Sequence, residues 1–185
     1  EIGTHTFSHY YCQEDGQTLE EFKADLVSAI AIAKAKNLEL RSLVFPRNQY
    51  KPEYLKVCRE LGILVYRGNE KAWYFAPDGK EGTTLKKKIY RTLDCYLNIS
   101  GHNSYSLSDL TSEMPHNIPS SRFLRPYMKK GGAILEYLKL QRIKKSMTHA
   151  AKNKLLYHLW WHPHNFGDNT ERNMKTLKAV LAHYK

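Results

Sequence analysis

The chain has 185 residues, of which 42% are hydrophobic and 12% aromatic, which suits a folded domain with a substantial core and excludes a disordered chain. Lysine and arginine number 29 against 18 acidic residues, giving a formal net charge of +11. That charge is compatible with nucleic-acid binding, but the basic residues are dispersed, with only short clusters at 86–88 and 142–145, so no nucleic-acid partner is expected.

Cysteine usage and hydropathy narrow the class further. Cys12, Cys58 and Cys95 are odd in number and form no CxxC pair, which argues against a disulfide framework or a cysteine zinc site and favours buried thiols. No run of 18 apolar residues occurs, so no spanning helix is expected. A cytoplasmic location is the expectation for the chain as it stands.

The first nine residues place two histidines, His5 and His9, four apart in an apolar, strand-like context. In an extended segment residues i and i+4 point to the same side, so both rings are able to direct a nitrogen at one zinc-sized ion. A zinc centre normally needs three protein ligands and a water, and two histidines do not complete it. With nine histidines in the chain, the spacing by itself leaves a chance pair open.

A βαβαβ rhythm follows this segment. Thr18 and Glu21 form a capping box, which predicts a helix from there to about Asn37. Residues 42–46 predict a short buried strand, residues 52–61 a helix capped by Gly62, and residues 63–67 the next strand. This alternation favours a parallel sheet with helical crossovers. The apolar face of the first helix consists of Leu19, Phe22, Leu26, Ala29, Ile30 and Ala33.

The remaining chain is less regular and is expected to belong to the same single domain, 1–185. Residues 73–75 predict a short strand or an aromatic patch, and a helix is expected from about Thr84 to Leu97. Glycine, proline and asparagine recur in 98–126, which predicts loops there. Two loop regions, 68–84 and 98–127, are expected to select the substrate. A long helix at 133–152, a strand at 155–161 and a final helix capped by Asn169 or Thr170 complete the pattern.

Two motifs carry a resemblance to a known family. Residues 1–9 resemble the second motif of the polysaccharide deacetylases, the NodB-homology or carbohydrate esterase family 4 enzymes, and residues 158–167 resemble the last motif. Segments 43–49, 62–68 and 119–126 resemble the branch found with surface-polysaccharide genes. The resemblance implies an α/β fold, part of a distorted, incomplete β/α barrel with its first strands missing. It also implies a metal-dependent hydrolase acting on an N-acetylated glycan or lipid-linked sugar.

The same resemblance implies roles for individual residues. His5 and His9 would bind the metal, usually zinc, and His162 would donate a proton to the leaving amine, with a satisfied strand-end histidine as the alternative. Arg47 matches the position of an arginine that pairs with the catalytic aspartate, or else faces solvent. Asp94 would orient His162, although an exposed helix acid fits the sequence equally well.

Substrate contacts are expected after the last strand. Trp160 and Trp161 point to opposite faces of a strand, so one is expected in the core, and Trp161 is expected to stack on a sugar ring or to form a wall of the pocket. The alternative is that both tryptophans pack in the core. His164 and Asn165 are assigned to the substrate, although the loop residues also suit a turn.

One departure from the family is pronounced. Family members carry an Asp-Asp pair that supplies the catalytic base and a third metal ligand, and this sequence has none. It opens without an initiator methionine, so it is expected to be the carboxy-terminal part of a longer protein and a poor catalyst alone. A glycan-binding relative without catalysis, or a basic nucleic-acid-binding domain, are the alternatives. An HExxH protease is excluded because Thr6 stands where that motif needs glutamate.

Overall fold

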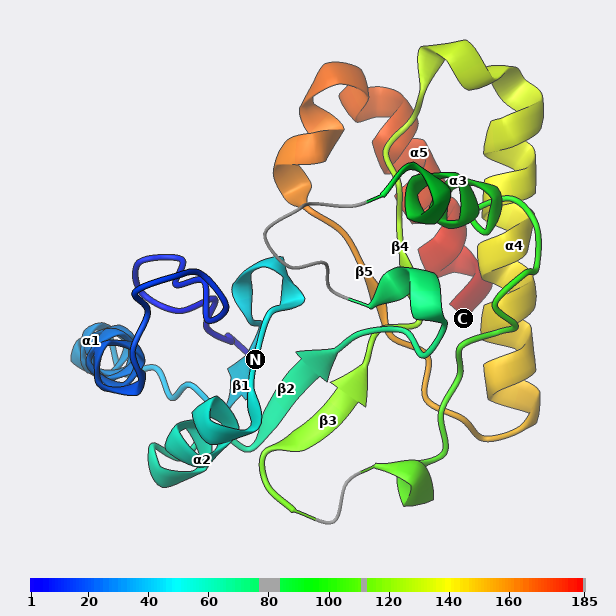
Figure 1. The fold of residues 1–185 in the computed structure, drawn as a ribbon. Coiled ribbons are helices and arrows are strands. Elements are labelled where there is room, and N and C mark those ends of the chain that lie inside the picture. The colour runs from blue at the N-terminus through cyan, green and yellow to red at the C-terminus, as the bar shows by residue number, and fades with distance from the viewer. Residues whose placement is uncertain (77–83, 111–112, 185) are drawn as a thin grey trace. The chain divides into compact units, whose positions relative to one another are not determined.

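The computed structural model describes residues 1–76, 84–110 and 113–184. They form two compact units that we describe separately (Figure 1). The first unit contains Glu1–Asn69 and the described part of 110–119. The second contains Glu70–Ala76, the described part of 83–109, and the described residues from Ser120 onward.

The first unit is built on a parallel sheet, as the βαβαβ pattern predicts. Its strand order is β1 (Ser42–Leu43), β2 (Val65–Gly68), β3 (His116–Pro119). Ser42 pairs with Val65, and Val65 pairs with His116. Thr4 adds an isolated parallel bridge to Leu43 at the free side of β1. Helices α1 (Leu19–Ala35) and α2 (Pro52–Glu60) make the crossovers.

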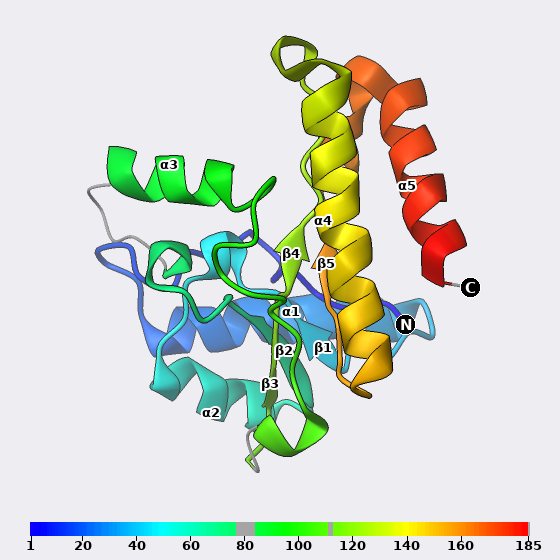
Figure 2. The ribbon, with the colours of Figure 1, turned by 90° about the vertical axis from the view of Figure 1, so that its right-hand side faces the viewer.

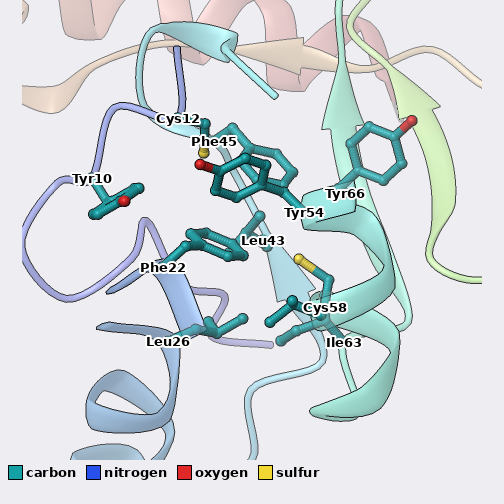
Figure 3. Packing of buried hydrophobic residues seen from close by; sticks show 11 residues of the cluster. Tyr10, Cys12, Phe22, Leu26, Leu43, Phe45, Tyr54, Cys58, Ile63 and Tyr66 are labelled. Carbon is teal, nitrogen blue, oxygen red and sulfur yellow. The ribbon is translucent and has the colours of Figure 1, made fainter. Parts of the chain in front are cut away.

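Helix α1 confirms the predicted capping box and apolar face. The Thr18 hydroxyl accepts from Glu21 N, and the Glu21 carboxylate accepts from Thr18 N. Phe22 and Leu26 are fully buried, and the Phe22 ring centroid lies 4.8 Å from that of Tyr54 on α2 (Figure 3). Burying a side chain of this size stabilises the fold by about 1.5–3 kcal/mol.

Three expectations about the strands are corrected. The histidine segment is not a strand, because only Thr4 pairs with the sheet, and Thr6 and His9 have φ of 63° and 61°. Strand β1 ends at Leu43, and Pro46 begins a 3-10 helix, η1 (Pro46–Asn48). The region 98–126, expected to be loops, contributes β3 to the first sheet and β4 to the second unit.

The second unit is mainly helical, around one short parallel pair, β4 (Arg122–Phe123) and β5 (Leu159–Trp160). Helices α4 (Gly132–Lys152) and α5 (Thr170–Tyr184) pack side by side (Figure 2). The aromatic segment 73–75 is a 3-10 helix, η2 (Trp73–Phe75), rather than a strand. The other elements are η3 (Leu107–Asp109), η4 (Lys129–Gly131), η5 (Pro163–Asn169) and α3 (Leu85–Leu93).

The predicted α/β class agrees with these two small parallel sheets. The described strands form no closed barrel, and the incomplete barrel stays a prediction. Cys12, Cys58 and Cys95 are buried free thiols, as expected. Among the described helices, none combines the length and the apolar character needed to cross a membrane.

Candidate functional site

His5 and His9 lie with their rings together in the first unit. The ring centroids are 4.7 Å apart at an interplanar angle of 71°. His5 Nδ1 lies 2.6 Å from the carbonyl oxygen of Val44, which is only able to accept, so Nδ1 carries the proton. The lone pair of His5 is therefore on Nε2, the arrangement of a metal-ligating histidine whose other nitrogen is fixed by a carbonyl.

Electrostatics keep His5 in its ligand form. Burial lowers the pKa of His5 below its ordinary value of 6.5, the hydrogen bond to Val44 offsets part of that effect, and electrostatic repulsion from His9 and Arg67 lowers the pKa further. At pH 7 the imidazole is consequently neutral, which is the protonation state that binds a metal.

A tight loop, not strand geometry, brings the two rings together. Asp25 on α1 accepts hydrogen bonds from the backbone N–H of Phe7 (2.7 Å) and of Ser8 (2.8 Å), and a further one from the Ser8 hydroxyl. The Thr6 hydroxyl accepts from Tyr10 N at 2.8 Å. The explanation by i, i+4 alternation was therefore wrong, although the two histidines do converge.

Arg47 lies in the same unit and reaches His9 through an aromatic ring. Its guanidinium carbon lies 4.1 Å from the centroid of the Tyr11 ring, and that ring meets His9 edge-on at 5.0 Å. Arg47 also forms an ion pair with Glu14 at 3.0 Å. The Arg47 side chain is 58% exposed, which agrees with the alternative of a solvent-facing arginine, and its pairing with a catalytic aspartate stays a prediction.

The fit of a metal to these residues is partial. In the described residues, no group of three or more histidine, cysteine, aspartate or glutamate side chains gathers in a metal-binding arrangement. His5 and His9 supply two nitrogen donors of the kind zinc prefers, with one tautomer already fixed. The chemistry of these donors therefore fits one half of a zinc centre.

His162 belongs to the second unit and lies two residues after the end of β5, because the strand expected at 155–161 covers only Leu159–Trp160. It precedes Pro163, where η5 begins, and its ring lies 5.3 Å from Trp160 and 5.1 Å from His164 between centroids. Asn165 N donates to His162 O at 3.0 Å, which closes the turn. The half-buried His162 is thus held in an aromatic setting, with His164 exposed beside it.

The two tryptophans pack on different neighbours, although Trp160 is only partly buried and Trp161 lies outside β5, so the predicted strand alternation is not confirmed. Trp160 packs on Phe123 at 4.5 Å between ring centroids. Trp161 is 36% exposed and stacks on Phe166 at 6.3 Å. Trp161 therefore presents an accessible ring, and its assignment to a sugar stays a prediction.

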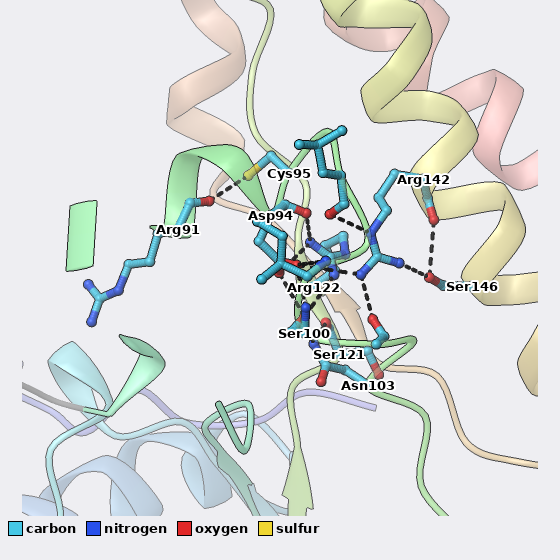
Figure 4. Close-up of polar contacts among 12 residues, drawn as sticks. Arg91, Asp94, Cys95, Ser100, Asn103, Ser121, Arg122, Arg142 and Ser146 are labelled. Carbon is cyan, nitrogen blue, oxygen red and sulfur yellow. Dashed lines mark hydrogen bonds and ion pairs between the residues drawn. The ribbon is translucent and has the colours of Figure 1, made fainter. Parts of the chain in front are cut away.

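Asp94 has an environment that the sequence did not indicate (Figure 4). It is completely buried, so the alternative of an exposed helix acid is wrong. Its carboxylate forms ion pairs with Arg122 (3.2 Å) and Arg142 (3.7 Å) and accepts from Ser100 N and Oγ, both at 2.8 Å. These contacts assign Asp94 to a structural network, and none of them supports a role on His162.

A pocket of about 610 Å³ opens in the second unit. One wall is aromatic, and the other is polar and anchored to the buried network. There the Ser100 hydroxyl donates to Asp94 and accepts from Asn103 Nδ2 at 2.8 Å. Lys71 Nζ lies 5.5 Å from the Tyr105 ring centroid. The lining side chains are Lys71, Ala72, Trp73, Tyr74, Tyr90, Ile99, Ser100, Asn103, Ser104 and Tyr105.

The pocket draws on both loops expected to select the substrate, although residues 77–83 of the first loop lie outside the described residues. Sequence reasoning missed Asp25 and Tyr11. Asp25 carried a signal, since it lies beside Leu26 on the apolar face of α1, where an unpaired acid is costly to bury. Tyr11 carried none.

In comparisons with known proteins, no family model, curated protein or solved structure matches the chain. Its function is therefore argued from the histidine pair, the strand-end histidine and the aromatic pocket.

Proposed function

We propose that the chain is part of a metal-dependent hydrolase that removes N-acetyl groups from a sugar of a surface polysaccharide or its precursor. The observation that carries this proposal is the convergence of His5 and His9, with His5 Nδ1 bound to the Val44 carbonyl and Nε2 available. A zinc ion held there would polarise the acetyl carbonyl and lower the pKa of a bound water.

The chain's own residues have separate tasks in this proposal. His5 and His9 hold the metal, and the Tyr11 ring and Arg47 guanidinium pack beside His9. His162 gives a proton to the sugar nitrogen as it leaves, a task suited to a group that titrates near neutral pH. The resemblance implies that the base is an aspartate of the Asp-Asp pair, and this sequence has no such pair. The activity is therefore proposed for a protein that contains this chain together with an Asp-Asp pair.

The pocket supports a sugar as the ligand. Aromatic rings such as Trp73 offer flat apolar faces for the C–H face of a pyranose, and Ser100 and Asn103 offer hydrogen bonds to its hydroxyls. The same pocket favours a second candidate, a glycan-binding protein without catalysis, which needs the pocket and not the histidine pair.

A calorimetric zinc titration of the chain tests the histidine pair. We expect binding in the wild type, its loss in His9→Ala, and its retention in His183→Ala, which removes an exposed histidine bonded to Thr148. Equal binding by the wild type and His9→Ala would contradict the metal site.

Acetate release separates the two candidate functions. The full-length protein is incubated with an N-acetylglucosamine oligomer, and we expect release that His162→Ala lowers by about 10²–10⁴-fold, the usual contribution of a general acid. If no acetate is released, but the protein binds the oligomer and Trp73→Ala abolishes this binding, the glycan-binding candidate would be established instead.

A further inference from the structure

Helix α3 exposes an apolar stripe. Leu85, Ile89 and Leu93 recur at four-residue steps and are 73%, 49% and 44% exposed. Leu97, 53% exposed, continues the spacing, because its N–H donates to Leu93 O at 2.9 Å and extends the turn. Residues four apart lie on one side of a helix, so these side chains form a single stripe.

The helix is attached by its other side. Tyr90 packs against Trp73 and Tyr74 of η2, with ring centroids 5.5 and 5.6 Å away. Arg91 Nη2 donates to Ala76 O at 3.3 Å, and no residue of α3 is buried. A surface helix normally buries its apolar face and leaves its polar face in water, and α3 has the reverse arrangement.

The exposed charges on the helix itself are of one sign. Lys86, Lys87, Lys88 and Arg91 lie on the helix, and the only acid between 84 and 97 is the buried, ion-paired Asp94. At 100° per residue, Lys88 lies at one edge of the stripe, and Lys86 lies beside Leu93 toward the other edge, with its Nζ 5.4 Å from the Trp73 ring centroid.

We propose that α3 docks on an anionic lipid surface. The leucine and isoleucine side chains enter the boundary between headgroups and acyl chains, while Lys86 and Lys88 bind the headgroups on either side. A narrow apolar stripe with cations along both edges is complementary to a planar layer that is apolar inside and anionic at its surface. An acidic protein would satisfy the lysines but would need an apolar groove of matching length. The inference is independent of the proposed deacetylase activity.

Vesicle sedimentation tests the proposal. Vesicles of phosphatidylcholine with about 30% phosphatidylserine are expected to bind the chain, and pure phosphatidylcholine vesicles to bind it about tenfold less. The double variants Leu85→Ser/Ile89→Ser and Lys86→Glu/Lys88→Glu are each expected to lose about tenfold or more in affinity. All four side chains are exposed, so the fold should be retained, which circular dichroism checks.

The control variant is Leu181→Ser/Lys178→Glu on α5, where both side chains are also exposed; it should bind as the wild type does. The proposal is overturned if the wild type fails to sediment with the anionic vesicles, or if the stripe variant binds as tightly as the wild type. It is also overturned if the control loses affinity equally, since that would indicate attraction by overall charge alone.

Discussion

At the scale of single residues, the candidate metal site depends on a side chain outside its own motif. Asp25 lies 17 positions from Ser8 in sequence and accepts two backbone N–H groups of the loop between His5 and His9. By accepting these two N–H groups, the buried Asp25 carboxylate holds the loop that contains the left-handed residues Thr6 and His9. The histidine rings meet because the loop is held, not because of their spacing.

Asp25→Asn is expected to lower the free energy of unfolding by about 1–3 kcal/mol, because the amide NH₂ would face a backbone donor where the carboxylate accepted two. Zinc affinity should fall as well, because the loop that presents His9 is released. Urea unfolding followed by circular dichroism and calorimetric zinc titration provide the two measurements.

Glu20→Gln on the same helix is the matched control, since it makes the same change of carboxylate to amide at an exposed position. It should leave zinc affinity unchanged. If Asp25→Asn bound zinc as the wild type does, the loop would not depend on this carboxylate.

At the scale of elements, α1 and α3 begin alike and are stabilised differently. Thr18 and Thr84 both cap by accepting a backbone N–H three residues on. Helix α1 then buries Phe22 and Leu26, whereas α3 buries no residue. Most helical stability in proteins comes from tertiary packing, so α1 is an integral part of the first core, whereas α3 lies at the surface and packs on η2.

Thr18→Ala removes the hydroxyl acceptor of the capping box of α1. We expect the free energy of unfolding to fall by about 0.5–2 kcal/mol, the usual cost of losing such a cap. Ser28→Ala, which removes an exposed mid-helix hydroxyl from the same helix, should cost less than about 0.5 kcal/mol. Chemical denaturation of the two variants gives the comparison, and equal losses would show that the cap contributes nothing particular.

At the scale of the whole molecule, buried charges connect segments far apart in the chain. Asp94, Arg122 and Arg142 are 0%, 4% and 5% exposed and form the centre of the second unit. Burial, with the nearby Arg122, lowers the pKa of Arg142, and Asp94 opposes the shift. One carboxylate therefore compensates two buried guanidinium groups and also anchors the polar wall of the pocket.

Asp94→Asn leaves those two guanidinium groups without a compensating negative charge. The expected loss of stability is about 3–5 kcal/mol, the cost of breaking a buried ion pair by removing one partner. Glu60→Gln removes a carboxylate from an exposed pair with Lys23 and should change the free energy of unfolding by at most about 1 kcal/mol. Thermal and urea denaturation would reveal the difference, and similar losses would contradict a structural role for Asp94.

The parts of the fold that the sequence predicted are those that depend on interactions between residues close together in the chain. The Thr18–Glu21 box, the apolar face of α1, Gly62 after α2 and the long α4 were all found from patterns within a few positions. The strand expected around His5 was wrong, and the region 98–126, expected to be loops throughout, also contains β3 and β4, since short strands are defined by their partners. Strand β3 is a strand because β2 lies beside it.

The sequence by itself determined where the main helices lie, although α3 ends at Leu93 and not at Leu97 as expected. It also determined which residue types are available: two histidines four apart, a histidine that follows the last strand, and a basic, leucine-bearing helix. Only the tertiary structure decided that Asp25 holds the histidine loop, that Asp94 is buried between arginines, and that α3 turns its leucines outward. The physical reason is the sequence separation over which each kind of interaction acts. Caps and helical periodicity act over three or four residues, whereas the direction in which a side chain points depends on partners such as Arg122, 28 positions from Asp94.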